Sequence, residues 1–136
     1  MNQTNTDRLI KEFPLLYADH NKSPTESLMC FGFETGDGWF QLIYDLSAKL
    51  EPLIQKWIDA NQDLAPDERL WHPRAVQVKE KYGGLRFYMT SSTDEMQDLI
   101  DEAEHKSETI CEMCGKPGKC NERGWITCLC DKCRNK

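Results

Sequence analysis

Residues 75–89 read AVQVKEKYGGLRFYM, and this stretch has the clearest β pattern in the chain. Two strand-like runs flank Gly83 and Gly84, which can supply the positive φ angles of a two-residue hairpin turn. Pairing around that turn divides the side chains between two faces. The core face carries Val76, Val78, Glu80, Tyr82, Leu85, Phe87 and Met89, and the basic face carries Gln77, Lys79, Lys81, Arg86 and Tyr88. This register places Lys81 directly opposite Arg86.

Two helices are expected before the hairpin. Residues 5–18 have the spacing of a short amphipathic helix that Pro14 breaks or kinks. The main core helix follows the GDG turn at 36–38, and Asp37 can cap its first turn. Its apolar positions are Trp39, Ile43, Leu46, Leu50, Ile54, Trp57 and Ile58. Because Pro52 lies inside this pattern, we expect a bend near Leu50 or two helices that meet there.

The remaining segments complete an α+β pattern. The apolar run LMCFGF at 28–33 predicts a buried strand, and residues 61–74 predict a loop. After the hairpin, STDE at 92–95 is a capping box that opens a helix. Its apolar stripe is Met96, Leu99, Ile100, Ala103 and Ile110, and its exposed positions are strongly acidic. We therefore expect a small antiparallel sheet with helices packed on one face.

Two CxxC pairs, CEMC at 111–114 and CDKC at 130–133, are separated by fifteen residues. This spacing is typical of a structural zinc site, because each tight turn places two sulfur atoms on one ion. Cys120 and Cys128 lie between the pairs, and a strand would point Cys128 to the same side as Cys130. The third ligand is therefore Cys128 or Cys130, and we favour Cys130 because it belongs to a CxxC turn.

The pattern thus predicts one structural Zn²⁺ bound by Cys111, Cys114, Cys130 and Cys133, in a zinc ribbon or knuckle at 109–136 that follows an α+β body at 1–108. The alternative roles for the two spare cysteines are a buried Cys128 under Trp125 and a free thiol at Cys120. An odd number of cysteines, seven, favours metal over disulfides, as expected in a reducing compartment.

The charge distribution and the absence of catalytic motifs limit the classes of function that the sequence supports. The net charge is −6, yet residues 111–136 carry six Lys/Arg against three Asp/Glu, so the acidic charge belongs to the body and argues against general affinity for nucleic-acid phosphate. A closed four-thiolate site supplies folding energy and leaves no position for substrate. His20, His72 and His105 occur singly, without a nucleophile motif or phosphate loop, which predicts a protein that is not an enzyme. Neither a membrane span nor a secretion signal is recognisable, so we expect a cytoplasmic protein.

Three motifs resemble a group of small, poorly characterised proteins of bacteria and their phages. They are GDGWF at 36–40, VKEKYGGLRFY at 78–88, and the CxxCGKPG motif from Cys111 that precedes RGW and CDKC. The similarity spans about residues 28–133. It implies metal ligands at positions 111, 114, 130 and 133, from which Cys120 and Cys128 depart. It also implies a phage or bacterial origin, and hence a role in host takeover or anti-defence.

Two functional hypotheses follow. The first is a zinc-binding protein-interaction factor, in the form of a phage-encoded inhibitor that contacts a host protein. The second is a nucleic-acid-binding accessory factor that uses Lys79, Lys81, Arg86 and Tyr88 of the hairpin together with basic ribbon residues, Lys119 and Arg123 among them. The basic hairpin face has an internal alternative, because the acidic helix after Asp94 is a suitable partner. The GDGWF loop and Trp71 are candidate contact sites or lids over the core.

Overall fold

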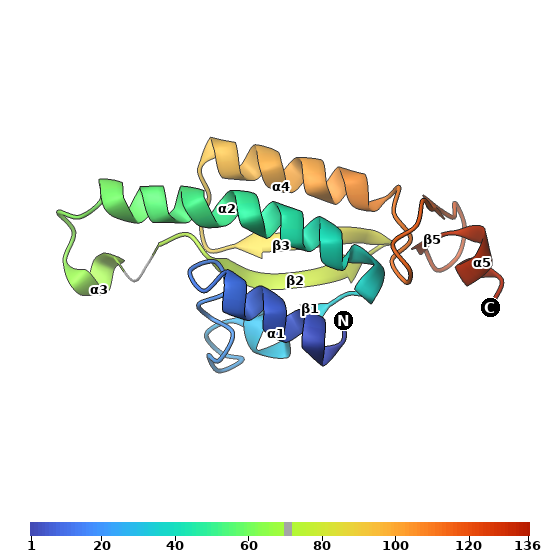
Figure 1. The fold of residues 1–136 in the computed structure, drawn as a ribbon, viewed down its shortest axis with the longest axis horizontal. Helices are drawn as coiled ribbons and strands as arrows, with labels where there is room; N and C mark the ends of the chain where they lie inside the picture. Colours follow the sequence, from blue (N-terminus) through green and yellow to red (C-terminus); the bar gives the residue numbers. More distant parts are fainter. Residues whose placement is uncertain (70–71) are drawn as a thin grey trace.

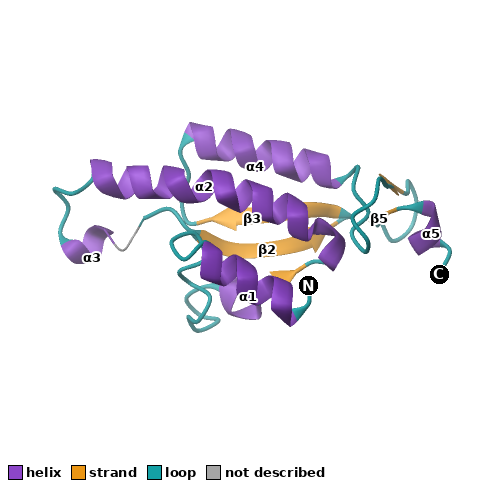
Figure 2. Ribbon diagram, viewed as in Figure 1, coloured by secondary structure: helices purple, strands orange, loops and turns teal. Residues whose placement is uncertain are grey.

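The computed structural model describes residues 1–69 and 72–136 of the 136-residue chain. In Figure 1, an α+β body is followed by a small cysteine-rich module that lies at one end of the longest axis. Figure 2 shows the same view by element type. The elements in chain order are α1 (Gln3–Glu12), η1 (Leu28–Phe31), β1 (Phe33–Glu34), η2 (Asp37–Trp39), α2 (Phe40–Ala60), α3 (Pro66–Arg69), β2 (Ala75–Lys81), β3 (Gly84–Met89), α4 (Asp94–Ser107), β4 (Lys119–Cys120), β5 (Cys128–Leu129) and α5 (Asp131–Arg134). The predicted α+β class is confirmed.

The main sheet has the strand order β1-β2-β3. Strands β2 and β3 form the predicted antiparallel hairpin, whereas the two-residue β1 joins β2 in parallel, so the sheet is mixed. Helices α1, α2 and α4 supply apolar side chains to the core on one face of this sheet (Figure 1). Leu9, Leu46, Ile100, Val78 and Phe87 illustrate how the three helices and two strands share that core.

The hairpin turns one residue earlier than predicted. Tyr82 and Gly83 take the positive φ angles, 53° and 85°, so Lys81 pairs with Gly84 and Lys79 pairs with Arg86. The expected pairing of Lys81 with Arg86 is therefore wrong. The shift moves β3 by two positions against β2, and since side chains alternate with period two, it preserves the two faces.

Both ends of the hairpin depart from the predicted core face. Tyr82 is 75% exposed in the turn. At the other end, an irregularity between Ala75 and Gln77 places Ala75 opposite Met89 and buries it, while Val76 is half-buried. Such a bulge re-aims side chains, so a residue of β2 other than the expected one enters the core.

The run 28–33 is not a buried strand. Residues Leu28–Phe31 form a 3₁₀ turn whose start is capped by Ser27, and Gly32 ends it at a φ of 69°. Only Phe33 and Glu34 pair with the sheet. Phe31 is 59% exposed. The predicted strand is wrong because the Ser and Gly residues at its ends favour a local cap over an extended backbone.

The helices confirm the main periodicities and correct their boundaries. Helix α1 ends at Glu12 before Pro14, whereas α2 runs through Pro52 as one helix, which excludes two separate helices there. Asp37 does not cap α2, because its carboxylate accepts from the backbone N–H of Asn2. Thr93, one residue inside the predicted box, caps α4. The expected loop at 61–74 contains α3, and Trp71 lies outside the described residues.

Helix α4 closes the outer edge of β3. The Ser107 hydroxyl accepts the Leu85 N–H at 2.9 Å, and the Glu104 carboxylate accepts the Phe87 N–H at 2.8 Å. Edge strands expose unpaired backbone groups, and these two side chains satisfy them. Burial raises the pKa of Glu104, and the Phe87 bond and nearby Arg86 oppose that shift. One acidic residue of α4 therefore serves the sheet edge.

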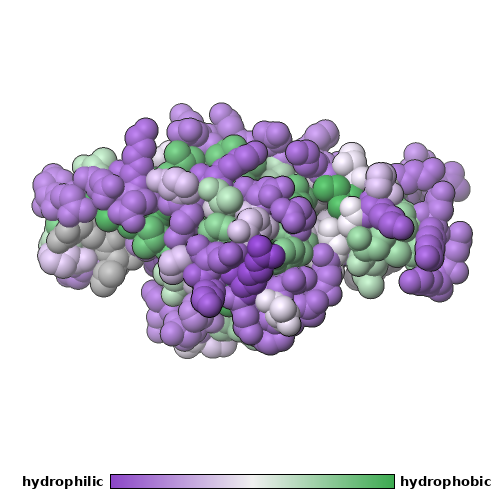
Figure 3. Space-filling model, in the orientation of Figure 1, coloured by the Kyte–Doolittle hydropathy of each residue, from purple (hydrophilic) through white to green (hydrophobic). Residues whose placement is uncertain are grey.

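The surface over the helices is mostly hydrophilic, with hydrophobic side chains in scattered patches on the face drawn in Figure 3. No helix among residues 1–69 and 72–136 combines the length and the apolarity needed to cross a bilayer.

Candidate metal centre

The four cysteines of the CxxC pairs meet in one cluster. Their Sγ atoms all lie within 4.8 Å of one another, and those of Cys114 and Cys130 are 3.6 Å apart. Zn–S bonds of about 2.3 Å in a tetrahedron separate neighbouring sulfur atoms by about 3.8 Å. The cluster is therefore positioned to bind one metal ion with all four thiolates.

Local turns present the sulfur atoms. Gly115 donates its N–H to the Cys111 carbonyl at 2.9 Å and has a φ of 82°, a left-handed conformation that suits glycine at the end of such a turn. On the other side, Cys130 is the N-cap of α5, and its sulfur accepts the Cys133 N–H at 3.4 Å. Each CxxC pair thus has a local turn that aims its two sulfur atoms toward the cluster.

The thiols of the cluster differ in pKa. Burial opposes ionisation of Cys111, but N–H donors from the backbone of Cys130, Cys114 and Met113 lower its pKa to about 6. The Cys133 N–H lowers the pKa of Cys130. The pKa of Cys133 rises to about 12, chiefly through its hydrogen bond with Cys130. A divalent cation would neutralise this concentration of negative charge, because metal-bound thiols are deprotonated.

The first CxxC turn docks on the turn before α2. The Gly38 N–H donates to the Glu112 carbonyl at 2.7 Å, and the Gly36 N–H donates to the Glu112 carboxylate at 2.8 Å. The Trp39 indole N–H donates to the Ile110 carbonyl at 3.0 Å, and Trp39 itself is fully buried. The GDGWF segment is therefore an internal dock for the metal module, and Trp39 closes over the core.

Two glycines make this docking sterically feasible. A Cβ at Gly38 would overlap the Cys111 carbonyl oxygen, and a Cβ at Gly36 would overlap the Glu112 carbonyl oxygen. Neither glycine has a left-handed φ. Their role is thus close approach of two backbones, the use of glycine that permits tight packing of one segment on another.

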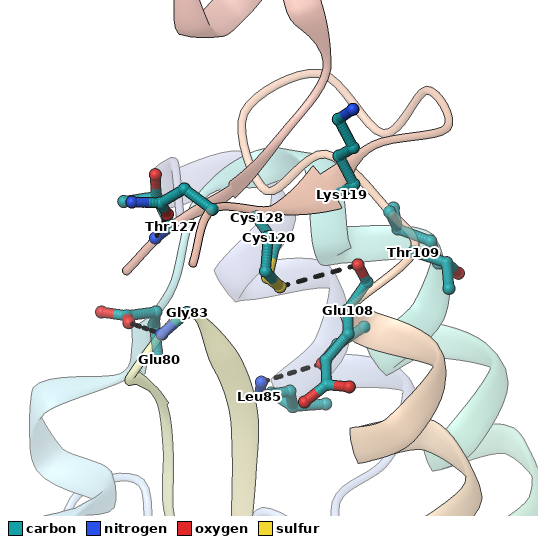
Figure 4. Close-up of a disulfide and its surroundings, with 12 residues drawn as sticks. Glu80, Gly83, Leu85, Glu108, Thr109, Lys119, Cys120, Thr127 and Cys128 are labelled. Atoms are coloured by element: carbon teal, nitrogen blue, oxygen red, sulfur yellow. Dashed lines mark hydrogen bonds between the residues drawn. A yellow bond between two sulfur atoms is a disulfide. The ribbon is translucent and has the colours of Figure 1, made fainter. Parts of the chain in front are cut away.

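The small hairpin of β4 and β5 docks on the β2–β3 turn. Cys120 and Cys128 pair across it as a disulfide, which Figure 4 shows above the turn at Gly83. Cys128 is buried, and Cys120 lies 3.7 Å from the Glu108 carbonyl oxygen. Neither sulfur belongs to the metal cluster. The expectations of a free Cys120 thiol and of metal in place of every disulfide are wrong, because the strand register brings these two residues together.

The predicted contact residues occupy two surfaces. Lys79, Lys81, Arg86 and Tyr88 share the sheet face away from the core, where a groove of about 680 Å³ is bordered by residues 24–28. Lys119 and Arg123 are exposed on the ribbon. Within the described part of the chain, no ion pair involves Lys79, Lys81 or Arg86. The expected pairing of the basic face with α4 is limited to Arg86, which lies near Glu104 at the sheet edge.

The sequence patterns do not mark three structural residues of the module. Glu112 anchors the first turn from inside a CxxC pair. The Arg134 guanidinium donates to the carbonyls of Lys119 and Thr127, and so fastens α5 to both ribbon strands. The Asn121 side chain spans the loop between those strands. No periodic pattern marks such residues, because each acts through one tertiary contact.

The histidines lie apart from the metal cluster. His72 is buried, with Nδ1 2.9 Å from the Pro73 carbonyl oxygen, and it lies close enough to Glu51 to influence that carboxyl. The Glu51 carboxylate accepts the N–H groups of Leu15 and Leu16. Both side chains therefore have structural partners. His105 lies in the last turn of α4.

No protein-family model, curated protein or solved structure matches this chain.

Proposed function

We propose that this protein is a non-enzymatic, zinc-binding interaction factor in which one structural Zn²⁺ holds the ribbon against the body. The observation that carries the proposal is the meeting of four cysteine sulfur atoms within 4.8 Å. Four thiolates in a compact, tetrahedral arrangement suit zinc, and such a closed site leaves no coordination position for water or substrate. The metal then stabilises a binding scaffold and performs no chemistry.

Metal analysis of the purified full-length protein tests the first part of the proposal. One zinc per chain is expected by native mass spectrometry, and Cys114→Ser or Cys133→Ser should lower zinc occupancy strongly. Cys30→Ser is the matched control, since Cys30 lies outside the cluster and its thiol donates to the Ser27 carbonyl. A chain that folds and remains free of metal when refolded with excess zinc contradicts the proposal.

The resemblance to small phage and bacterial proteins makes a host defence protein the first class of partner to test for the interaction role. The zinc-loaded chain serves as bait in bacterial lysate, with and without nuclease. A single protein that binds after nuclease treatment in moderate salt, and that binds again when purified, supports an inhibitor acting by contact. Loss of every partner upon nuclease treatment points to nucleic acid.

The second candidate function is a nucleic-acid-binding accessory factor. It is favoured by the basic sheet face, where Lys79 and Arg86 are cross-strand neighbours without ion pairs among the described residues. Like charges directly opposite each other repel, so an anionic ligand would relieve them. Binding that weakens steeply with salt and is lost in Lys79→Glu supports this function, and salt-insensitive behaviour argues against it.

A further inference from the structure

Two strongly exposed aromatic residues lie where the ribbon meets the body. Trp125 is 82% exposed and Tyr82 is 75% exposed, the two highest values among the large hydrophobic residues that the structure describes. They come from different elements, but their neighbours touch: a Cβ at Gly83 would lie 2.8 Å from Ile126 Cγ2. We call Lys81, Tyr82, Arg123 and Trp125, which lie on the two segments that this approach brings together, the aromatic tip.

The loop that carries Trp125 is held in place from within. The Asn121 amide donates to the carbonyls of Arg123 and Trp125 at 2.7 and 3.0 Å, and its oxygen accepts the Thr127 N–H at 2.7 Å. The Cys120–Cys128 disulfide closes the base of this loop. A loop ordered in this way presents its tryptophan at little further entropic cost, which is how preorganised binding loops gain affinity.

Tyr82 occupies a position that its side chain does not favour. Its φ of 53° is left-handed, where glycine or asparagine is preferred in a hairpin turn. The ring makes little contact with the fold, since it is mostly exposed. A bulky residue kept in an unfavourable conformation and pointed at solvent indicates a role outside the fold.

A cation lies over one ring, and a second cation is close in sequence to the other. Lys81 Nζ lies 5.6 Å from the centre of the Tyr82 ring, and Arg123 is two residues before Trp125 on an exposed loop. The Glu80 carboxylate, next to Lys81, accepts the Gly83 N–H. The loop that carries Trp125 contains one acidic residue, Glu122. Exposed rings with adjacent cations match a ligand that carries flat bases and phosphates in alternation.

We propose that the aromatic tip binds a short segment of single-stranded nucleic acid, with bases stacked on Trp125 and Tyr82 and phosphates beside Lys81 and Arg123. This inference places nucleic-acid binding at a site other than the basic sheet face of the second candidate function, and it rests on the proposed metal only in that the metal orders the ribbon. Stacking supplies most of the affinity, because two cations on an acidic protein release few counterions. The logarithm of the binding constant should therefore fall with the logarithm of salt concentration with a slope of only about −1 to −2.

The test uses the zinc-loaded full chain and fluorescein-labelled oligo(dT) and oligo(rU) of about 12 nucleotides, followed by anisotropy. Wild-type protein should bind both probes, and the bound oligonucleotide should quench the tryptophan emission of the protein. Trp125→Ala should weaken binding about tenfold and abolish the quenching, and Tyr82→Asn, which suits the left-handed turn, should weaken binding by a similar factor. Phe31→Ala is the matched control, because it removes an exposed aromatic residue on η1 and should leave the affinity unchanged.

Each outcome discriminates among the hypotheses. Zinc content and unfolding temperature are measured in every variant, so loss of the metal scaffold is recognised separately from loss of binding. Absence of wild-type binding at about 100 µM protein overturns the inference. So does unchanged affinity in both Trp125→Ala and Tyr82→Asn, and a loss confined to Lys79→Glu transfers binding to the sheet face. Recovery of a purified protein partner that depends on Trp125, without oligonucleotide binding, assigns the tip to protein contact instead.

Discussion

The backbone N–H of Gly38 donates a 2.7 Å hydrogen bond to the backbone carbonyl of Glu112. This bond joins the turn before the main core helix to the first CxxC turn of the metal cluster. Because the neighbouring indole of Trp39 is buried and bonds to the Ile110 carbonyl, the metal module forms part of the wall of the core. Changes at this contact should therefore affect both metal binding and the stability of the body.

Gly38→Ala should destabilise the protein by about 3 kcal/mol, because the added Cβ would overlap the Cys111 carbonyl oxygen, which belongs to the backbone and has little freedom to move. Urea unfolding followed by circular dichroism measures the loss. Gly84→Ala is the control, since its nearest neighbour is the flexible end of the Arg86 side chain. Equal stability of the two variants would show that the backbone at Cys111 can move away to make room for a Cβ at position 38.

Removal of the metal should loosen the body as well as the module. A structural site contributes several kcal/mol to folding, and a loss of about 3 kcal/mol lowers the Tm of a chain of this size by about 10 °C. Hydrogen exchange after chelation should accelerate at residues 36–43 as well as at 109–136. Exchange changes confined to residues 109–136 would instead identify an independent module.

Ser107→Ala should cost about 1–3 kcal/mol, because it leaves the buried Leu85 N–H at the edge of β3 without an acceptor. Thermal unfolding of the variant and of wild type measures the difference. Ser91→Ala provides the comparison, since Ser91 is exposed and its substitution should change the Tm little. A neutral Ser107→Ala would mean that water replaces the hydroxyl at this edge.

Glu51 should make stability decline with rising pH. Burial raises the pKa of its carboxyl, against the opposing Leu15 and Leu16 N–H groups and His72, so the folded state binds the proton more tightly than the unfolded state does. Its contribution is then most favourable below the unfolded pKa, near pH 4, and is lost as pH rises through the folded pKa. Glu51→Gln cannot titrate.

The stability of wild type relative to Glu51→Gln should therefore fall as pH rises from about 4, the usual pKa of an unfolded Glu, through the raised folded pKa. Urea unfolding of both proteins across this range tests the sign, and the comparison between the two cancels metal loss in acid. A relative stability that rises with pH would show that the two backbone N–H donors outweigh burial and lower the pKa.

Local patterns were sufficient for much of the fold and of the metal cluster. The CxxC spacing carries its own information, because each pair needs only one tight turn to aim two sulfur atoms, as Gly115 and the Cys130 cap show. Alternation likewise assigned the core and basic faces of the β2–β3 hairpin, which a two-position shift of register leaves intact. Helical spacing found α2 and α4 through their buried stripes.

The errors occur where two local solutions are nearly equivalent. A two-residue turn can lie at Gly83–Gly84 or one residue earlier at Tyr82–Gly83; local preference favours the first, and the second is the one in which Gly83 contacts Ile126. The GDGWF pattern also suits an external contact loop, but in the fold the first CxxC turn occupies this site. Cys120 was readable as a free thiol until strand pairing placed it against Cys128.

The sequence by itself determined the main helices α2 and α4, the β2–β3 hairpin with its two faces, and the four cysteines that meet, because spacing along one helix, strand or turn dictates each of these. Only the tertiary structure decided the hairpin register, the docking of the metal module on residues 36–39 and the approach of the loop at Ile126 to the turn at Gly83. Those features depend on contacts between segments distant in the chain, whose energies no local pattern records.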